Sequence, residues 1–218
     1  MKKTDSMTEP TRIVNLERAH GAAVARLHRQ AIPQGFLSRL GDAFLANLYL
    51  GIAAAPDAVV WVAVDQDDQV LGFVSGTINT RICYRQILLR RGWLLGILAI
   101  PSLVNPANIR HILETLRYPR DQESDQAETT TAPSQAAELL SIAVDTEARG
   151  LGLGRKLVEA LEQSLRERHY RGAYRVVTSA SDPRSNAFYL GVGFRHQREF
   201  QHHDHAMNEY IKDLEQSW

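Results

Sequence analysis

The feature that constrains this chain most is a run of glycines at alternate positions, ARGLGLGRKL, at residues 148–157. Three glycines lie between two arginines, and an apolar-periodic stretch typical of a helix follows them. The first amides of a helix have no intrahelical partners and point outward at the positive end of the helix dipole. Glycine removes the side chains that would keep a bulky anion away from these amides. The run therefore predicts a turn into a helix that binds a phosphate or pyrophosphate.

Glycine spacing alone is a weak signal, and a plain turn is the simplest alternative. A dinucleotide-binding fingerprint needs its third glycine one residue later, and an NTPase phosphate loop needs Gly-Lys followed by Ser or Thr. Neither pattern is present in the run. The sequence on either side of the glycines is therefore needed to choose between a plain turn and an anion-binding turn.

The C-terminal half alternates strands and helices around the glycine run. Residues 138–145 predict a strand before it, and the leucine stripe of residues 155–170 predicts a helix after it. A strand is predicted at 173–180, and a short helix at 184–194 with Gly193 at its end. Closing strands follow within 199–214.

The N-terminal part predicts a strand at 12–16, helices at 19–32 and 36–52, and a hairpin of two strands joined by QDDQ at 66–69. Residues 1–10 have the composition of a loose tail. We expect a single domain over residues 11–218.

Residues 81–136 form a distinct insertion. Its first part mixes apolar residues with arginines, and two prolines, Pro101 and Pro106, are expected to break it. A basic and apolar segment is compatible with a membrane surface or a protein partner. We expect instead a pair of helices packed on the core, without membrane contact. The polar, acidic residues 119–136 predict a mobile loop that is dispensable for folding.

The bulk composition excludes several classes of protein. Lys and Arg together number 25, as do Asp and Glu, so the chain lacks the basic excess of a nucleic-acid-binding protein. A single cysteine, Cys83, forbids an internal disulfide and suits a reducing compartment. No apolar run reaches the roughly 18 residues of a membrane-spanning helix. We expect a cytoplasmic protein, and leave open a homodimer.

Together with FYLGVGF at 188–194, the glycine run resembles the GNAT superfamily of N-acetyltransferases. Arg149, Gly152 and Gly154 match the family motif Arg/Gln-x-x-Gly-x-Gly/Ala, which follows its fourth strand. Tyr189, followed by Gly193 and Phe194, matches a second motif one helix and one strand later. The resemblance implies an α/β fold with a mixed, mostly antiparallel central sheet flanked by helices, and a helical insertion before the fourth strand.

The resemblance also implies a reaction. Such an enzyme moves an acetyl group from acetyl-CoA, its cosubstrate, to a primary amine by direct attack in a ternary complex, without a metal. The pattern GFLSRLGDAFLANLY is similar to a subgroup of bacterial surface-polysaccharide biosynthesis, so an amino sugar is one candidate among small-molecule acceptors. By the resemblance, the free edge of the fourth strand and the turn would hold the cosubstrate through Ile142, Ala143, Val144, Arg149, Gly150, Leu151, Gly152, Leu153, Gly154 and Arg155.

Two residues are candidates for the chemistry. The resemblance gives Tyr189 the role of protonating the departing thiolate, and the alternative is a tyrosine that only packs in the core. Glu138 is the candidate to deprotonate the acceptor ammonium, directly or through water. Its alternative is an exposed carboxylate at a strand end. Ribosomal-protein N-terminal acetyltransferases of the family have a glutamate where this chain has Val177, which disfavours a protein N-terminus as acceptor.

Other positions leave questions open. Asp182 stands where the family commonly has an asparagine that contacts the cofactor, and Asn186 is a candidate replacement. The HHDH sequence at 202–205 predicts a surface turn rather than a metal site. The resemblance implies that this turn borders the acceptor pocket, with His203 or Asp204 as the residue in contact with substrate. The rival function is an acyl-CoA-binding sensor without turnover, or a partner-binding module.

Overall fold

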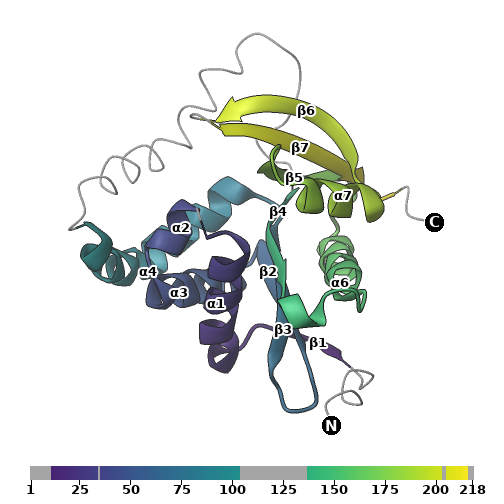
Figure 1. Ribbon diagram of the computed structural model, residues 1–218. Helices are drawn as coiled ribbons and strands as arrows, with labels where there is room; N and C mark the ends of the chain where they lie inside the picture. Colours follow the sequence, from purple (N-terminus) through teal and green to yellow (C-terminus); the bar gives the residue numbers. More distant parts are fainter. Residues whose placement is uncertain (1–10, 34, 104–136, 203–204, 216–218) are drawn as a thin grey trace.

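The computed structural model describes residues 11–33, 35–103, 137–202 and 205–215, and these form one seven-stranded sheet between two layers of helices (Figure 1). The strand order is β1-β2-β3-β4-β5-β7-β6. Every neighbouring pair is antiparallel except β4 and β5. The predicted mixed, mostly antiparallel α/β fold is confirmed. The strands are β1 (Arg12–Asn15), β2 (Ala58–Val64), β3 (Val70–Thr77), β4 (Ala137–Val144), β5 (Ala173–Ser179), β6 (Arg195–His202) and β7 (His205–Asp213).

Each face of the sheet has its own hydrophobic core. The core on one face includes Val24, Leu45 and Phe73, and lies under the first group of helices. The core on the other face includes Leu157, Tyr174 and Phe194, and lies under the second group. The first group is α1 (Gly21–Ala31), α2 (Phe36–Arg39), α3 (Asp42–Ala53) and α4 (Thr80–Leu103), and the second is α6 (Leu153–Glu167) and α7 (Pro183–Gly191), with short 3-10 turns η1 (Arg18–His20) and η2 (Thr146–Ala148).

The structure corrects two predicted helices. The single helix expected at 36–52 is divided at Gly41, whose φ of +89° suits glycine and interrupts the helical backbone. The pair of helices expected from residue 81 is one helix, α4, which continues past Pro101 to Leu103. Pro101 lies near the end of α4, where it removes one backbone donor from the helix without ending it. The predicted acidic loop at 119–136 and the N-terminal tail at 1–10 lie outside the described residues. So does the sequence NIRHILETLRY at 108–118, whose pattern predicts a further helical stretch.

α6 packs closely on the sheet, and polar contacts hold it there. A Cβ atom on Gly76 of β3 would lie 2.6 Å from Leu161 Cδ1 and 3.1 Å from the Glu138 carbonyl oxygen, so a larger residue there would force Leu161 to shift. The buried carboxylate of Glu162 accepts a hydrogen bond from the Tyr174 hydroxyl at 2.6 Å and pairs with Lys212 Nζ at 2.5 Å. These contacts join α6 to β5 and β7.

Candidate active site

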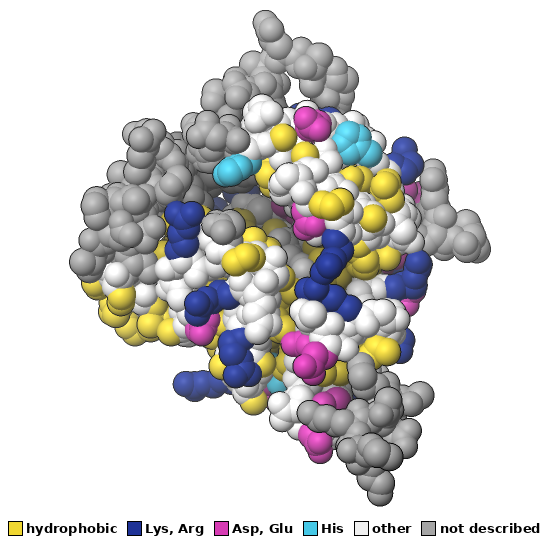
Figure 2. Space-filling view, in the orientation of Figure 1, with side chains coloured by type: hydrophobic (Ala, Val, Ile, Leu, Met, Phe, Trp, Pro, Cys, Tyr) yellow, Lys and Arg dark blue, Asp and Glu magenta, His cyan; other side chains and the backbone are white. Residues whose placement is uncertain are grey.

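β4 and β5 diverge, and the candidate site lies where they part. The two parallel strands pair only at Ala137 with Tyr174 and at Glu138 with Arg175. Beyond these pairs β4 continues to Val144 along β3, while β5 continues to Ser179 along β7. The edge of β4 that faces β5 is therefore free over Ile142–Val144, and its peptide groups need partners from elsewhere. The space-filling view is hollowed between the helices α1–α4 and the half of the molecule that carries α6 and α7 (Figure 2).

A bulge bends β4 at the same place. Ser75 of β3 pairs with Ser141, but the next residue, Gly76, pairs with Leu139, so Leu140 is an extra residue. On the side of α1 and α3, the Tyr49 hydroxyl lies 2.6 Å from His28 Nδ1, and this buried contact joins the two helices. Burial lowers the pKa of His28 to about 4, so its imidazole is neutral at physiological pH.

The glycine turn has the geometry expected of an anion-binding loop. Gly150 and Gly152 have φ values of +84° and +74°, and a Cβ atom on either would meet nothing within 4 Å. Both positions therefore favour glycine for its backbone conformation, and both face open space. Gly154 differs, because a Cβ atom there would lie 2.8 Å from Phe188 Cε2 of α7. α6 begins at Leu153 without a side-chain cap, which leaves its first amides available to a ligand.

The two arginines beside the glycines have different surroundings. Arg149 is exposed and makes no ion pair with the described residues. Arg155 donates from Nη2 to the Gly191 carbonyl at 2.7 Å, so its guanidinium joins the start of α6 to the end of α7. The backbone amide of Arg155 stays at the helix start, with those of Leu151 and Leu153.

Tyr189 has a buried ring and a hydroxyl without a partner. The ring is 6% exposed and packs against Phe188, Phe194 and Tyr210, with centroids 5.4, 5.6 and 5.9 Å away. No described residue forms a hydrogen bond with its hydroxyl. Burial, and then the charge of Asp182, raise the pKa of this phenol, so it stays protonated and able to donate. Packing and proton donation are compatible in this position.

Asp182 and Asn186 organise α7. Asp182 is the N-cap of the helix: it accepts from the Ser185 hydroxyl at 2.6 Å and from the amides of Arg184 and Ser185. The Ser185 hydroxyl is the main cause that lowers the pKa of Asp182. Asn186 donates to the Ser179 carbonyl, while its own side-chain oxygen accepts from Asn208 and Tyr210. A cofactor contact from Asn186 would have to replace one of these bonds.

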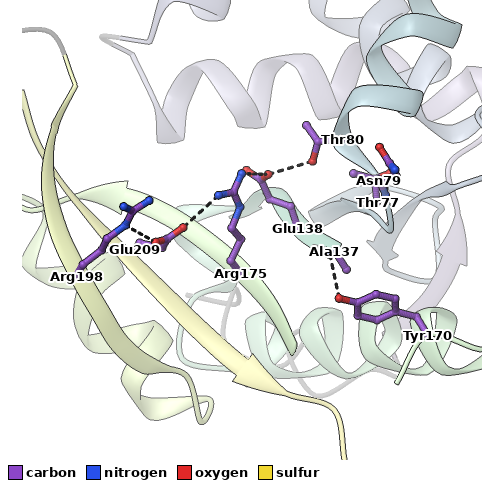
Figure 3. A network of polar contacts seen from close by, with 9 residues as sticks. All are labelled: Thr77, Asn79, Thr80, Ala137, Glu138, Tyr170, Arg175, Arg198 and Glu209. Atoms are coloured by element: carbon purple, nitrogen blue, oxygen red, sulfur yellow. Dashed lines mark hydrogen bonds and ion pairs between the residues drawn. The ribbon is translucent and has the colours of Figure 1, made fainter. Parts of the chain in front are cut away.

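Glu138 belongs to a chain of charged side chains across four elements (Figure 3). Its Oε2 accepts from Thr80 Oγ1 of α4 at 3.0 Å and from Arg175 Nη2 of β5 at 3.2 Å. Arg175 also reaches Glu209 of β7 at 3.2 Å, and Glu209 pairs with Arg198 of β6 at 2.7 Å. The side chain of Glu138 is only 17% exposed, so the alternative of an exposed strand-end carboxylate is wrong. Oε1 of Glu138 accepts no hydrogen bond from the described residues.

Arg175 is the centre of this network. Burial alone would lower the pKa of its guanidinium, but the adjacent carboxylates of Glu138 and Glu209 outweigh burial and raise it. Its Nε is buried and has no partner among the described residues. The residue therefore stays charged and joins β4 to β5 and β7 at the point of divergence.

Glu209 is the site residue that the sequence did not reveal. The register of β5 and β7 places it opposite Val177, so a carboxylate from the neighbouring strand stands next to the position where the resemblance led us to look for one. Both of its oxygens accept from arginines. The only signal in the sequence was a lone glutamate in the alternating MNEYI of the last strand.

His203 and Asp204, which the resemblance implied to border the acceptor pocket, lie outside the described residues. Next to them, His202 and His205 form the last pair of the β6–β7 hairpin. Across residues 11–33, 35–103, 137–202 and 205–215, no group of three His, Cys, Asp or Glu side chains is placed to hold a metal ion. None of the helices in these ranges is long and apolar enough to cross a membrane.

Comparison with known proteins agrees with this geometry. Residues 111–194 match the model of the acetyltransferase (GNAT) family. No curated protein matches the chain in sequence. An N-acetyltransferase from Staphylococcus aureus Mu50 is similar in structure, with a TM-score of 0.60, 15% identity, and coverage of 94% of this chain and 99% of that one.

Two further solved structures have the same fold. A ribosomal-protein-alanine N-acetyltransferase from Brucella melitensis has a TM-score of 0.58 at 16% identity, with 93% of this chain and 99% of that chain covered. An acetyltransferase of Salmonella typhimurium, solved with its cofactor acetyl-CoA, has a TM-score of 0.58 at 12% identity, with 94% and 95% covered. The motifs, the match of residues 111–194 to the family model and the fold of the similar structures all agree with a GNAT acetyltransferase domain in this chain.

Proposed function

We propose that the protein is an N-acetyltransferase that moves the acetyl group of acetyl-CoA to a primary amine of a small molecule. The observation that carries the proposal is the divergence of β4 and β5 beside the glycine turn. The free edge of β4 offers unpaired peptide groups to an amide-rich arm, and the turn offers amides to a pyrophosphate. Acetyl-CoA has both parts, in that order.

The cosubstrate is held by backbone more than by side chains in this proposal. Ile142, Ala143 and Val144 pair with the pantetheine arm through the strand edge. The amides of residues 150–155 bind the pyrophosphate, and Arg149 adds a positive charge from solvent. Arg155 contributes its amide, since its guanidinium is held by Gly191. Asn186 acts indirectly, by fixing α7 and Tyr189 against β5 and β7.

The residues around the divergence supply two proton transfers. Acetyl-CoA supplies an activated thioester, and the acceptor nitrogen attacks its carbonyl carbon. Glu138, through Oε1 or an intervening water, takes the proton that the ammonium must lose. The carbon–sulfur bond breaks as the carbon–nitrogen bond forms, and Tyr189 gives its proton to the departing thiolate. Arg175 and Thr80 hold Oε2 of Glu138, so they fix the direction of the free oxygen.

Acceptor identity is the open part of the proposal, with an amino sugar as the first candidate. The similar structures do not narrow the choice of acceptor, because the name of one gives ribosomal-protein alanine as its acceptor and the name of another gives phosphinothricin. A panel of amino sugars, polyamines, amino acids and peptides, followed by thiol release from acetyl-CoA, tests the proposal. Amine-dependent release that requires Glu138 supports an enzyme. Tight acetyl-CoA binding without release for any amine supports the rival, a non-catalytic acyl-CoA sensor.

A further inference from the structure

α4 exposes a row of large apolar side chains. Leu89, Trp93, Ile97 and Ile100 are 77%, 71%, 54% and 54% exposed. They follow one another by four, four and three residues, so they lie on one side of the helix. Cys83, Ile87 and Leu95 are buried on the other side, where α4 packs on the core. In the space-filling view, hydrophobic side chains gather at the lower left edge, near α3 and α4 (Figure 2).

Positive charge borders this row on both sides. Helical spacing of about 100° per residue places Arg85 on one side of the row and Arg90 on the other. Both side chains are exposed, and neither forms an ion pair with the described residues. The sequence of α4 has four arginines and no acidic residue. The helix thus offers an apolar strip, including a tryptophan, between two unpaired cations.

The exposure of this face changes the expectation from sequence that the segment has no membrane contact. We propose that this face of α4, formed by Leu89, Trp93, Ile97, Ile100, Arg85 and Arg90, docks on the surface of an anionic membrane. Apolar side chains with a tryptophan enter the boundary between headgroups and acyl chains, and flanking arginines pair with lipid phosphates. The helix lies in the plane of the surface and does not cross the bilayer, in keeping with its arginines. The proposal is independent of the acetyl-transfer reaction.

A second copy of the chain fits this surface less well. In a two-fold symmetric contact the same patch meets itself. The arginines of both copies would then approach one another without a carboxylate on α4 to pair with them. An anionic lipid surface supplies the missing opposite charge as well as an apolar interior.

Co-sedimentation of the full chain with vesicles tests the proposal. The vesicles contain phosphatidylcholine alone or an equal mixture with phosphatidylglycerol. We expect the wild type to bind the mixed vesicles and not the neutral ones, and to be released by high salt. The double variant Arg85→Glu, Arg90→Glu should bind at least about thirtyfold more weakly. The double variant Trp93→Ser, Ile97→Ser should lose binding to a similar degree.

The matched control changes the same charge elsewhere. Arg18→Glu with Arg26→Glu alters two exposed arginines of the N-terminal helices and should leave vesicle binding within about twofold of the wild type. Unchanged thermal melting shows that each variant is folded. The proposal is overturned if the wild type binds neither kind of vesicle, or if the control variant loses as much vesicle binding as the α4 variants. A solution dimer that Trp93→Ser, Ile97→Ser dissociates would also overturn it, because the face would then join two copies.

Discussion

At the scale of single residues, the proposed mechanism divides the site into groups that contact the reacting atoms and groups that position them. Tyr189 has a free hydroxyl on a packed ring, and Glu138 has one oxygen held and one free. Arg175 and Thr80 act through Glu138. Separate predictions therefore follow for Tyr189, the proposed proton donor, and for Arg175, which positions the proposed base Glu138.

Tyr189→Phe keeps the ring and its packing but deletes the proton donor. We expect a folded protein whose kcat falls at least about tenfold, equivalent to about 1.4 kcal/mol in the barrier, with KM for acetyl-CoA unchanged. We expect the effect in kcat because the hydroxyl stabilises the transition state more than the bound ground state. Single-turnover kinetics measure it without interference from product release. A variant as fast as the wild type would make Tyr189 a packing residue only.

Arg175→Lys keeps the charge but loses the planar fork that reaches both Glu138 and Glu209. We expect kcat to fall roughly tenfold while KM for acetyl-CoA stays constant, because Glu138 is no longer held in one direction. Steady-state kinetics give both constants. The matched control is Arg198→Gln, which removes the outer arginine and leaves the bond from Arg175 to Glu138 intact. Equal losses in the two variants would contradict a specific role for Arg175.

At the scale of elements, buried polar contacts between helices and strands position the site. The buried contact between His28 and Tyr49 joins α1 to α3. Asp182 starts α7 as its cap, and Pro183 follows at the first helical position.

The buried imidazole of His28 makes stability depend on pH. Its pKa is about 4 in the folded protein against 6.5 for an ordinary histidine, so between these values the unfolded chain binds a proton that the folded one does not. Stability therefore falls as pH drops from about 6.5 to about 4, by up to about 3 kcal/mol from this residue.

Urea unfolding at several pH values measures this dependence. His28→Gln removes the titrating group, and we expect the difference in unfolding free energy between pH 7 and pH 4.5 to shrink by about 2 to 3 kcal/mol. His169→Gln, at an exposed turn position, is the control and should leave the slope unchanged. An unaltered slope in His28→Gln would show that the imidazole does not stay neutral in the folded protein.

At the scale of the whole molecule, the order of strands and helices was predictable from the sequence. The spacing of apolar residues and the positions of turn residues can both be recognised within a short stretch of the chain. The glycine turn was predictable for the same reason. The break at Gly41 was not, since helical spacing continues across it, and neither was the passage of α4 through Pro101. Glu209 could not be found because its place opposite Val177 depends on the register of strands distant in sequence. The exposure of one face of α4 likewise follows from how the helix packs, not from its composition.

Calorimetric titration of acetyl-CoA into the wild type and Gly152→Asp tests the central claim most directly, that the turn before α6 binds the pyrophosphate. The substitution places a carboxylate and a Cβ atom in open space where the anion should lie. Gly96→Asp, on the exposed part of α4, makes the same change far from the turn and serves as control. The account predicts that the wild type and Gly96→Asp bind acetyl-CoA, and that folded Gly152→Asp binds at least about a hundredfold more weakly. Equal affinity in all three proteins would contradict it.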